Sequence, residues 1–283
     1  MSNTLGDPVQ PASGMLVLNA SKLKDFATCP RRYFLGSVLK LARADTDEGG
    51  RAQLGSAVHA ELFARHEDMH THDSPEPVDG SLGLTTTALS MVRRHLELCP
   101  SNPHHHEPGQ ELRFELAGPI SASLRVPPEG SLPTGKPDRE LQYLGGERDL
   151  HWLIIRRALL ITGRVDALWR YPDGTIEVRD YKTGTCPDSL EEDIGAQIYL
   201  LLAANLPERP TKIRVTYESL GRDEAQTVSI DANRANLSQA LQLVTNHAEH
   251  IRKERTFPAY PSITACGTCP YQHLCPEAQH FSE

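Results

Sequence analysis

Two stretches in the middle of the chain carry side chains that together could hold a divalent metal ion. The first stretch ends at Asp166, and the second contains Asp180 and Lys182. The turn signal Pro172-Asp173-Gly174 lies between them, so the two stretches are predicted to pair as an antiparallel hairpin. Such a hairpin places Asp166 beside Asp180. Two carboxylates that close repel each other, and a divalent cation would relieve the repulsion.

The chemistry that follows is hydrolysis of a phosphodiester. Mg²⁺ held by Asp166 and Asp180 would polarise a phosphoryl oxygen and lower the pKa of a bound water. Lys182 could orient that water or help deprotonate it, and could stabilise the developing negative charge. An isolated Asp-x-Lys is more often a structural salt bridge at a sheet edge. Here side-chain alternation puts Asp180 and Lys182 on the same strand face as Ile176 and Val178, where buried charges must be paired or bind a metal.

Two further residues fit the same site. His59 falls in a helix predicted at about 53–66, near its apolar side. A lone histidine there is usually a satisfied core group, but its imidazole could be a further metal ligand. Gln197 lies on a helix predicted at about 189–205, where it could contact a phosphate or the lysine.

Four cysteines are divided between the two ends of the chain: Cys29 near the N-terminus, and Cys266, Cys269 and Cys275 near the C-terminus. Four thiolates suit either Zn²⁺ or an iron-sulfur cluster, and their spacing does not separate the two. A centre that joined both ends would restrict the unfolded chain by roughly 5 kcal/mol on a chain-entropy estimate. Cys99 and Cys186 fall outside the pattern.

Length and charge limit the other possibilities. The 283 residues suffice for one large domain. We expect no membrane association, because no apolar run is as long as a membrane span. The protein is predicted to lie in the cytoplasm, where thiols stay reduced. The net charge of −8 is unlike that of proteins that hold nucleic acid through their overall field. Nucleic-acid binding must therefore rest on the site.

The elements that would position these groups alternate between helix and strand. We expect a disordered tail over 1–14 and a single domain over 15–283, with an insertion at about 117–158. The order predicts an α/β fold. The histidines at 66, 70, 72 and 104–106 are predicted to be polar surface residues. Helices are predicted at about 53–66, 84–98, 189–205 and 232–254, and strands at about 111–116, 151–156, 158–170, 175–181, 211–218 and 225–230.

The motifs, taken in order from about residue 16 to 278, resemble those of the PD-(D/E)XK nucleases of the RecB/AddB type. More narrowly, they resemble the branch with an iron-sulfur cluster, which includes the AddB nuclease domain and the CRISPR adaptation nucleases. The resemblance rests on these motifs: Cys29-Pro30-Arg31, Gly55-x-x-x-His59, Gly163-Arg-Val-Asp166, Asp180-Tyr-Lys182-Thr183-Gly184, Gln197 and Cys266-x-x-Cys269-x5-Cys275.

This resemblance implies a restriction-endonuclease-like core, in which helices flank a central mixed β-sheet. It also implies that the four cysteines join the two ends of the chain around a 4Fe-4S cluster. The main cluster segment would be 264–278. It implies that Lys182 assists hydrolysis. Glu111 resembles an acidic position common in the group. The ligands implied for Mg²⁺ or Mn²⁺ are His59, Asp166, Asp180 and the backbone carbonyl of Tyr181, and the residues implied to bind DNA are Gln197, Arg31 and Tyr199.

One departure concerns the tyrosine that the family often has four residues after the glutamine. This chain has Leu201 there, and Tyr199 is out of that register.

Two functions follow as expectations. The first is a metal-dependent DNA nuclease, either an exonuclease or an enzyme that cuts flaps or single strands. The second is a DNA-binding subunit of a helicase-nuclease or CRISPR-adaptation-like complex with weak or gated activity alone, which the low positive charge favours. A zinc-stapled structural protein without turnover is a third class, and the intact Asp166, Asp180 and Lys182 speak against it.

Overall fold

The computed structural model describes residues 14–44, 48–69, 85–100, 142–208, 210–221 and 226–281. The tail predicted over 1–14 lies outside these residues apart from Gly14, and so do Glu111 and residues 117–141 of the predicted insertion. The chain separates into two compact units. The first unit comprises residues 1–49, 153–161 and 242–283, and the second comprises 50–152 and 162–241.

A mixed β-sheet runs through the chain, as the α/β prediction required. Strand β3 pairs with β1 in parallel and with β4 antiparallel, β4 pairs with β5 in parallel, and β5 pairs with β6 antiparallel. Strand β2 also pairs with β3. The strands are β1 (Leu16–Leu18), β2 (Gln142–Ile154), β3 (Leu159–Arg170), β4 (Thr175–Lys182), β5 (Lys212–Ser219) and β6 (Gln226–Asp231).

The hairpin between β3 and β4 forms at the predicted turn. Gly174 adopts a φ of 87°, which favours glycine, and the Asp173 carboxylate accepts a hydrogen bond of 2.9 Å from the Thr175 amide. The pairing brings Ala167 opposite Arg179. Asp166 and Asp180, the next residues outward on each strand, therefore come to the same end of the hairpin.

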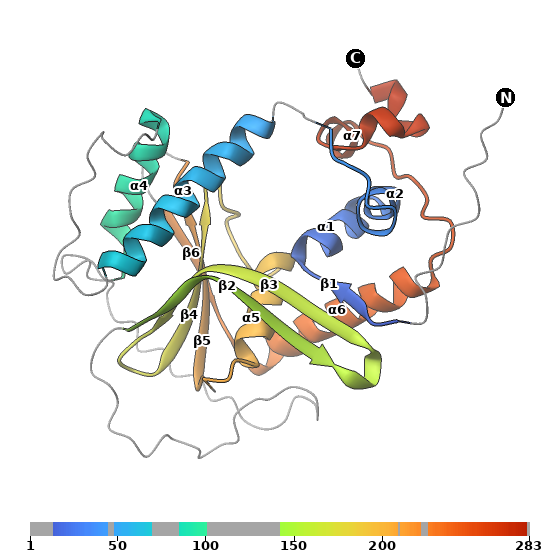
Figure 1. The fold of residues 1–283 in the computed structure, drawn as a ribbon. Helices are drawn as coiled ribbons and strands as arrows, with labels where there is room; N and C mark the ends of the chain where they lie inside the picture. Colours follow the sequence, from blue (N-terminus) through green and yellow to red (C-terminus); the bar gives the residue numbers. More distant parts are fainter. Residues whose placement is uncertain are drawn as a thin grey trace. The chain divides into compact units, whose positions relative to one another are not determined.

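Helices cover both faces of the sheet in the second unit. On one face, α3 (Glu48–Met69) and α4 (Thr86–Leu98) lie side by side (Figure 1). Their residues Val58, Leu62 and Val92 share one apolar core with Trp169 and Tyr181 of the sheet. Helix α5 (Ile194–Ala204) contacts β4 and β5 and is buried along nearly its whole length.

Strand β2 begins about ten residues earlier than the sequence predicted, at Gln142 rather than near 151. The start of this strand was not predicted because it contains Gly145 and Gly146, and glycine usually weakens a β-strand. At Gly146 the glycine serves a close approach: a Cβ there would lie 2.5 Å from the Asp166 carbonyl oxygen. The absent side chain lets β2 pass directly beside the end of the acidic hairpin.

Charged side chains also fill the face of β4 that α3 and α4 cover. Arg179 is fully buried, and its guanidinium lies 3.0 Å from the Glu218 carboxylate and 3.4 Å from that of Glu177. It also donates a hydrogen bond of 2.9 Å to the Leu98 carbonyl at the end of α4. This network ties α4 to two neighbouring strands, and it satisfies charges that would otherwise be costly to bury.

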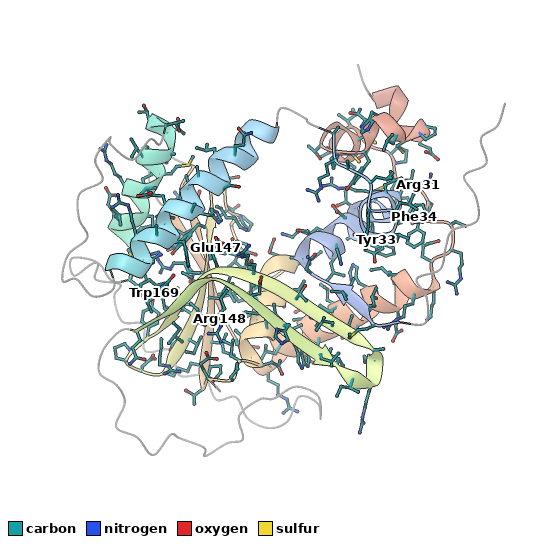
Figure 2. All side chains as sticks on the ribbon, in the orientation of Figure 1. Arg31, Tyr33, Phe34, Glu147, Arg148 and Trp169 are labelled. Atoms are coloured by element: carbon teal, nitrogen blue, oxygen red, sulfur yellow. The ribbon has the colours of Figure 1, made fainter. Side chains whose placement is uncertain are left out.

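In the first unit, segments from both ends of the chain pack together. Phe257 stacks on Tyr33 and on Phe34, with ring centroids 6.1 and 5.0 Å apart; Figure 2 labels both partners. Pro30 begins a second helix at its first position, where the missing N–H of proline leaves no hydrogen bond unmade. The helices here are α1 (Ala20–Thr28), α2 (Pro30–Tyr33), the part of α6 (Arg234–Lys253) from residue 242 onward, and α7 (Ile263–Gly267). Among the described residues, no helix is long and apolar enough to cross a membrane.

The buried network yields a prediction about stability. Replacing Arg179 by methionine leaves Glu177 buried without its cation and removes one of the partners of Glu218, so the free energy of unfolding should fall by about 3–5 kcal/mol. Arg214→Met is the matched control, because Arg214 pairs with Asp231 at a partly exposed place on β5 and should lose about 1 kcal/mol or less. Urea unfolding of both variants measures the difference, and equal losses would contradict the role given to the network.

Candidate functional site

The two aspartates of the hairpin lie together at the end of β3 and β4. Asp166 is 9% exposed and Asp180 is 5% exposed. The Asp166 carboxylate accepts a hydrogen bond of 2.6 Å from the Tyr181 amide, which holds it against β4. Burial raises the pKa of Asp180, and the neighbouring Asp166 raises it further, although Lys182 acts in the opposite direction. The repulsion expected from the sequence is therefore present in the folded chain.

Lys182 faces the same site. Its ammonium group pairs with the Asp180 carboxylate and lies 4.5 Å from the centroid of the Tyr217 ring. The Tyr217 hydroxyl in turn donates a hydrogen bond of 2.8 Å to Asp193, the N-cap of α5. Burial lowers the pKa of Lys182, but the ion pair with Asp180 outweighs it, so the pKa is raised and the amine keeps its proton.

His59 of α3 completes the group of predicted ligands. Its Nε2 atom lies 3.0 Å from the Tyr181 carbonyl oxygen, and its Nδ1 atom lies 3.2 Å from an Asp166 oxygen. Burial lowers the pKa of His59, but the hydrogen bond and the charge of Asp166 raise it overall. The imidazole, the Asp166 carboxylate and the Tyr181 carbonyl, far apart in sequence, thus converge on one point.

Glu147 joins this group, and the sequence did not predict it. One of its carboxylate oxygens lies 3.9 Å from His59 Nδ1, and the other lies 2.9 Å from Arg164 Nε. It projects from β2 beside α3, as Figure 2 shows. The available signal was the pair Gly145-Gly146 just before it, which marks a close backbone approach. The acidic candidate that the sequence favoured, Glu111, lies outside the described residues.

An open pocket of about 710 Å³ adjoins these groups. It is lined by His59, Glu147 and Arg164, together with Gly55, Ser56, Ala60, Phe63 and Gly146. Gly55 belongs to the predicted Gly55-x-x-x-His59 motif, so the motif lies along one wall. A phosphate group that entered here would meet the acidic ligands from the side of α3.

Tyr199 and Gln197 of α5 lie behind the acidic pair. The Tyr199 hydroxyl lies 3.0 Å from an Asp180 oxygen and 2.7 Å from the Arg164 carbonyl oxygen. Gln197 is 1% exposed and donates its side-chain amide to the Glu191 carbonyl. Both contacts are internal, and the DNA-binding role of these two residues stays a prediction.

The four predicted cluster cysteines, Cys29, Cys266, Cys269 and Cys275, all line one pocket in the first unit. The Tyr260 amide donates a hydrogen bond of 3.4 Å to the Cys29 sulfur, across more than two hundred residues of sequence. Arg31, beside Cys29, donates from Nε to the Phe257 carbonyl at 2.9 Å. Its role in DNA binding also stays a prediction.

One prediction about histidines is wrong. His66 was expected to be a polar surface residue, but it is 2% exposed. Helix α3 extends to Met69 rather than ending near residue 66, so the side chain of His66 packs against the Trp169 ring in the interior. The acidic residues that follow His66 in the sequence suggested a loop and concealed this.

Comparison with known proteins gives a family match over most of the chain. The family model described as the PD-(D/E)XK nuclease superfamily matches residues 17–276. No curated protein matches the sequence. Among solved structures, the chain is similar to SSO0001, with 14% identity, coverage of 92% of this chain and 85% of that chain, and a TM-score of 0.37.

A second similar structure is a protein from Eubacterium rectale that carries a provisional description as an exonuclease. It is 12% identical, with coverage of 93% of this chain and 87% of that chain, and the TM-score is 0.47. The family match spans nearly the whole sequence and includes every residue of the hairpin site. The chain belongs to the PD-(D/E)XK nuclease superfamily.

Proposed function

We propose that this chain is a Mg²⁺- or Mn²⁺-dependent nuclease of the RecB/AddB type that hydrolyses phosphodiester bonds in DNA, as an exonuclease or as an enzyme that cuts flaps or single strands. One observation carries the proposal: His59, Asp166 and the Tyr181 carbonyl converge beside the Asp180–Lys182 pair. The family to which the chain belongs supports it.

The groups present fit a hard divalent cation. Asp166, Asp180 and the Tyr181 carbonyl offer oxygen ligands, which Mg²⁺ and Mn²⁺ prefer, and His59 adds an imidazole nitrogen. Burial, together with the neighbouring Asp166, raises the pKa of Asp180, and a bound cation would counter both effects. When bound, such an ion would polarise a phosphoryl oxygen and lower the pKa of a water molecule.

The chain's own residues provide the remaining functions. Lys182, kept protonated by Asp180, can donate its Nζ protons to a phosphate oxygen and stabilise the negative charge of the transition state. The Tyr217 ring under the ammonium group and the Tyr199 hydroxyl against Asp180 fix both members of the pair. Because the hydrogen bond from the Tyr181 amide orients Asp166, the two acids reach the site in one arrangement.

The alternative is a DNA-binding subunit with weak or gated activity, which works with a helicase or another nuclease-complex subunit. The net charge of −8 favours it, because the chain's overall field does not attract DNA. Purified wild-type chain, assayed alone on labelled single-stranded DNA with Mn²⁺, separates the two functions. Cleavage supports the nuclease, whereas binding without cleavage supports the subunit.

For the four cysteines we propose a 4Fe-4S cluster, in a nuclease domain over 15–283 whose cluster segment is 264–278. The four cysteines line one pocket, so they could hold one centre together. The division into one cysteine near the N-terminus and three near the C-terminus resembles the nucleases that carry such a cluster, which favours it over a single Zn²⁺. The reducing cytoplasm is the compartment we propose for it.

The first prediction from this proposed function concerns the Asp180–Lys182 ion pair at the hairpin. Lys182→Ala removes the charge that stabilises the transition state, so the cleavage rate should fall by about 10²–10⁴-fold, and Asp180→Asn should do the same. Lys212→Ala is the control, because Lys212 pairs with Asp173 at the exposed turn. Rates on labelled DNA with Mn²⁺ are the measurement. A Lys182→Ala enzyme that cuts at the wild-type rate would show that the site is elsewhere.

The second prediction concerns Glu147. Glu147→Gln removes a carboxylate that faces His59, and should raise the Mn²⁺ concentration for half-maximal cleavage by about 10–100-fold. Asp149→Asn is matched to it, because Asp149 lies two residues further along β2 with a side chain that is 84% exposed. The measurement is the cleavage rate of both variants as a function of Mn²⁺ concentration. If the two curves were indistinguishable, Glu147 would not belong to the metal site.

The third prediction concerns the cysteine pocket. Cys266→Ser should lose the iron and sulfide found in anaerobically purified wild type, together with up to about 5 kcal/mol of stability. Cys186→Ser should retain both, since Cys186 belongs to the second unit. Wild type without iron, whose zinc content falls in Cys266→Ser, would refute the 4Fe-4S assignment and leave a zinc centre at the same cysteines.

A further inference from the structure

Two imidazoles and a thiol meet in the interior of the second unit, away from the pocket of the hairpin site. The Nε2 atoms of His66 on α3 and His95 on α4 lie 3.0 Å apart, and the Cys99 sulfur lies 3.6 Å from His66 Nε2. All three ligand atoms lie within 4.8 Å of one another. The three residues are 2%, 0% and 2% exposed.

We propose that His66, His95 and Cys99 bind a buried zinc ion, separate from the nuclease metal and from the four-cysteine centre. A tetrahedral Zn²⁺ with Zn–N distances of about 2.0–2.1 Å and Zn–S of about 2.3 Å holds two nitrogens about 3.3 Å apart and a nitrogen and a sulfur about 3.6 Å apart. The separation of the two nitrogens, 3.0 Å, and that of His66 Nε2 from the Cys99 sulfur, 3.6 Å, differ from these by a few tenths of an ångström at most. Imidazole and thiolate are also the ligands that zinc takes most often.

The surroundings of His95 match those of a metal ligand. Its Nδ1 atom lies 2.8 Å from a Glu218 oxygen, and the other oxygen of Glu218 is held by Arg179 at 3.0 Å. Histidines that bind metals commonly donate their second ring N–H to a carboxylate, which fixes the ring and its tautomer. In the tautomer that donates Nδ1–H to Glu218, His95 Nε2 carries a lone pair, and this atom lies 3.0 Å from His66 Nε2.

Charge balance is compatible with the same occupant, although a protonated His95 beside Glu218 would also balance the set without a metal ion. The buried set contains the carboxylates of Glu177 and Glu218 and the guanidinium of Arg179, all at most 1% exposed. A Cys99 thiolate would add one negative charge, and Zn²⁺ would then make the whole set neutral. Neutrality matters because an uncompensated charge in this interior would be costly.

The chain presents the ligands in a pre-formed arrangement. His95 and Cys99 are four residues apart at the end of α4, so they lie on one side of that helix. Arg179 binds the Leu98 carbonyl and so fixes the backbone just before Cys99. The rings of Tyr143, Trp169 and Tyr181 pack around His66 and shield the site from water.

Three protein ligands leave the fourth position of the ion to a small ligand such as water. The Tyr181 hydroxyl is buried and has no hydrogen-bond partner among the described residues. Its ring centroid lies 4.7 Å from that of His95, so it is a candidate partner for this ligand. None of the three zinc ligands belongs to the hairpin site, and the inference does not rest on the nuclease activity.

Metal analysis of protein expressed with zinc in the medium tests the proposal. Cys99→Ala and, independently, His66→Gln should each lower the zinc content by about one equivalent per chain, with the iron content unchanged. Cys186→Ala is the control for loss of a lone thiol and should match wild type. Equal zinc in wild type and both variants would overturn the proposal and leave a hydrogen-bonded network in its place.

X-ray absorption at the zinc edge of the wild-type protein requires no variant, so it decides even if a substitution prevents folding. The expected first shell contains one sulfur at about 2.3 Å and nitrogens at about 2.0–2.1 Å. A shell made of sulfur alone would place the zinc at the four cysteines and refute the site. Absence of zinc from wild type would refute it equally.

Discussion

The cost of burying charge on both faces of strand β4 governs this structure. Burial extends over seven of the eight residues of the strand, and these include Glu177, Arg179 and Asp180, with Lys182 following at the half-buried end. Such groups persist in an interior only when each has a partner. The Arg179 network provides partners on one face. On the other face Asp166 and Asp180 lie together, with Lys182 paired to Asp180 and His59 3.2 Å from Asp166. The two adjacent carboxylates make this second face suited to a cation.

The hairpin and its acids could be predicted from the sequence because the information is local. The Pro172-Asp173-Gly174 turn and the alternation of β4 fix which side chains share a face, and pairing follows from them. Gly146 and Glu147 could not be predicted in this way. Their meaning depends on how closely β2 approaches the Asp166 carbonyl, which is a tertiary fact. His66 was missed for a related reason, since its burial depends on where α3 ends.

Tyr181 connects the two faces of the strand. Its backbone carbonyl lies against His59 and its amide against Asp166, whereas its side chain packs among His66 and His95. A displacement of the ring would therefore bear on the carbonyl and the amide as well, because all belong to one residue, which is held on the other side by its pairing with Glu218 of β5. The packing of the face under α3 and α4 thus helps to determine the geometry of the acidic face.

Helix α3 reinforces that dependence. His59 and His66 are seven residues apart, close to two helical turns, so they project from the same side of α3. His59 meets the hairpin acids near one end of this side, and His66 meets His95 and Cys99 near the other. A helix held at both points has little freedom to rotate or slide over the sheet. Whatever fixes His66 in the interior also fixes the distance of the His59 imidazole from Asp166, and so bears on how well a cation could be held there.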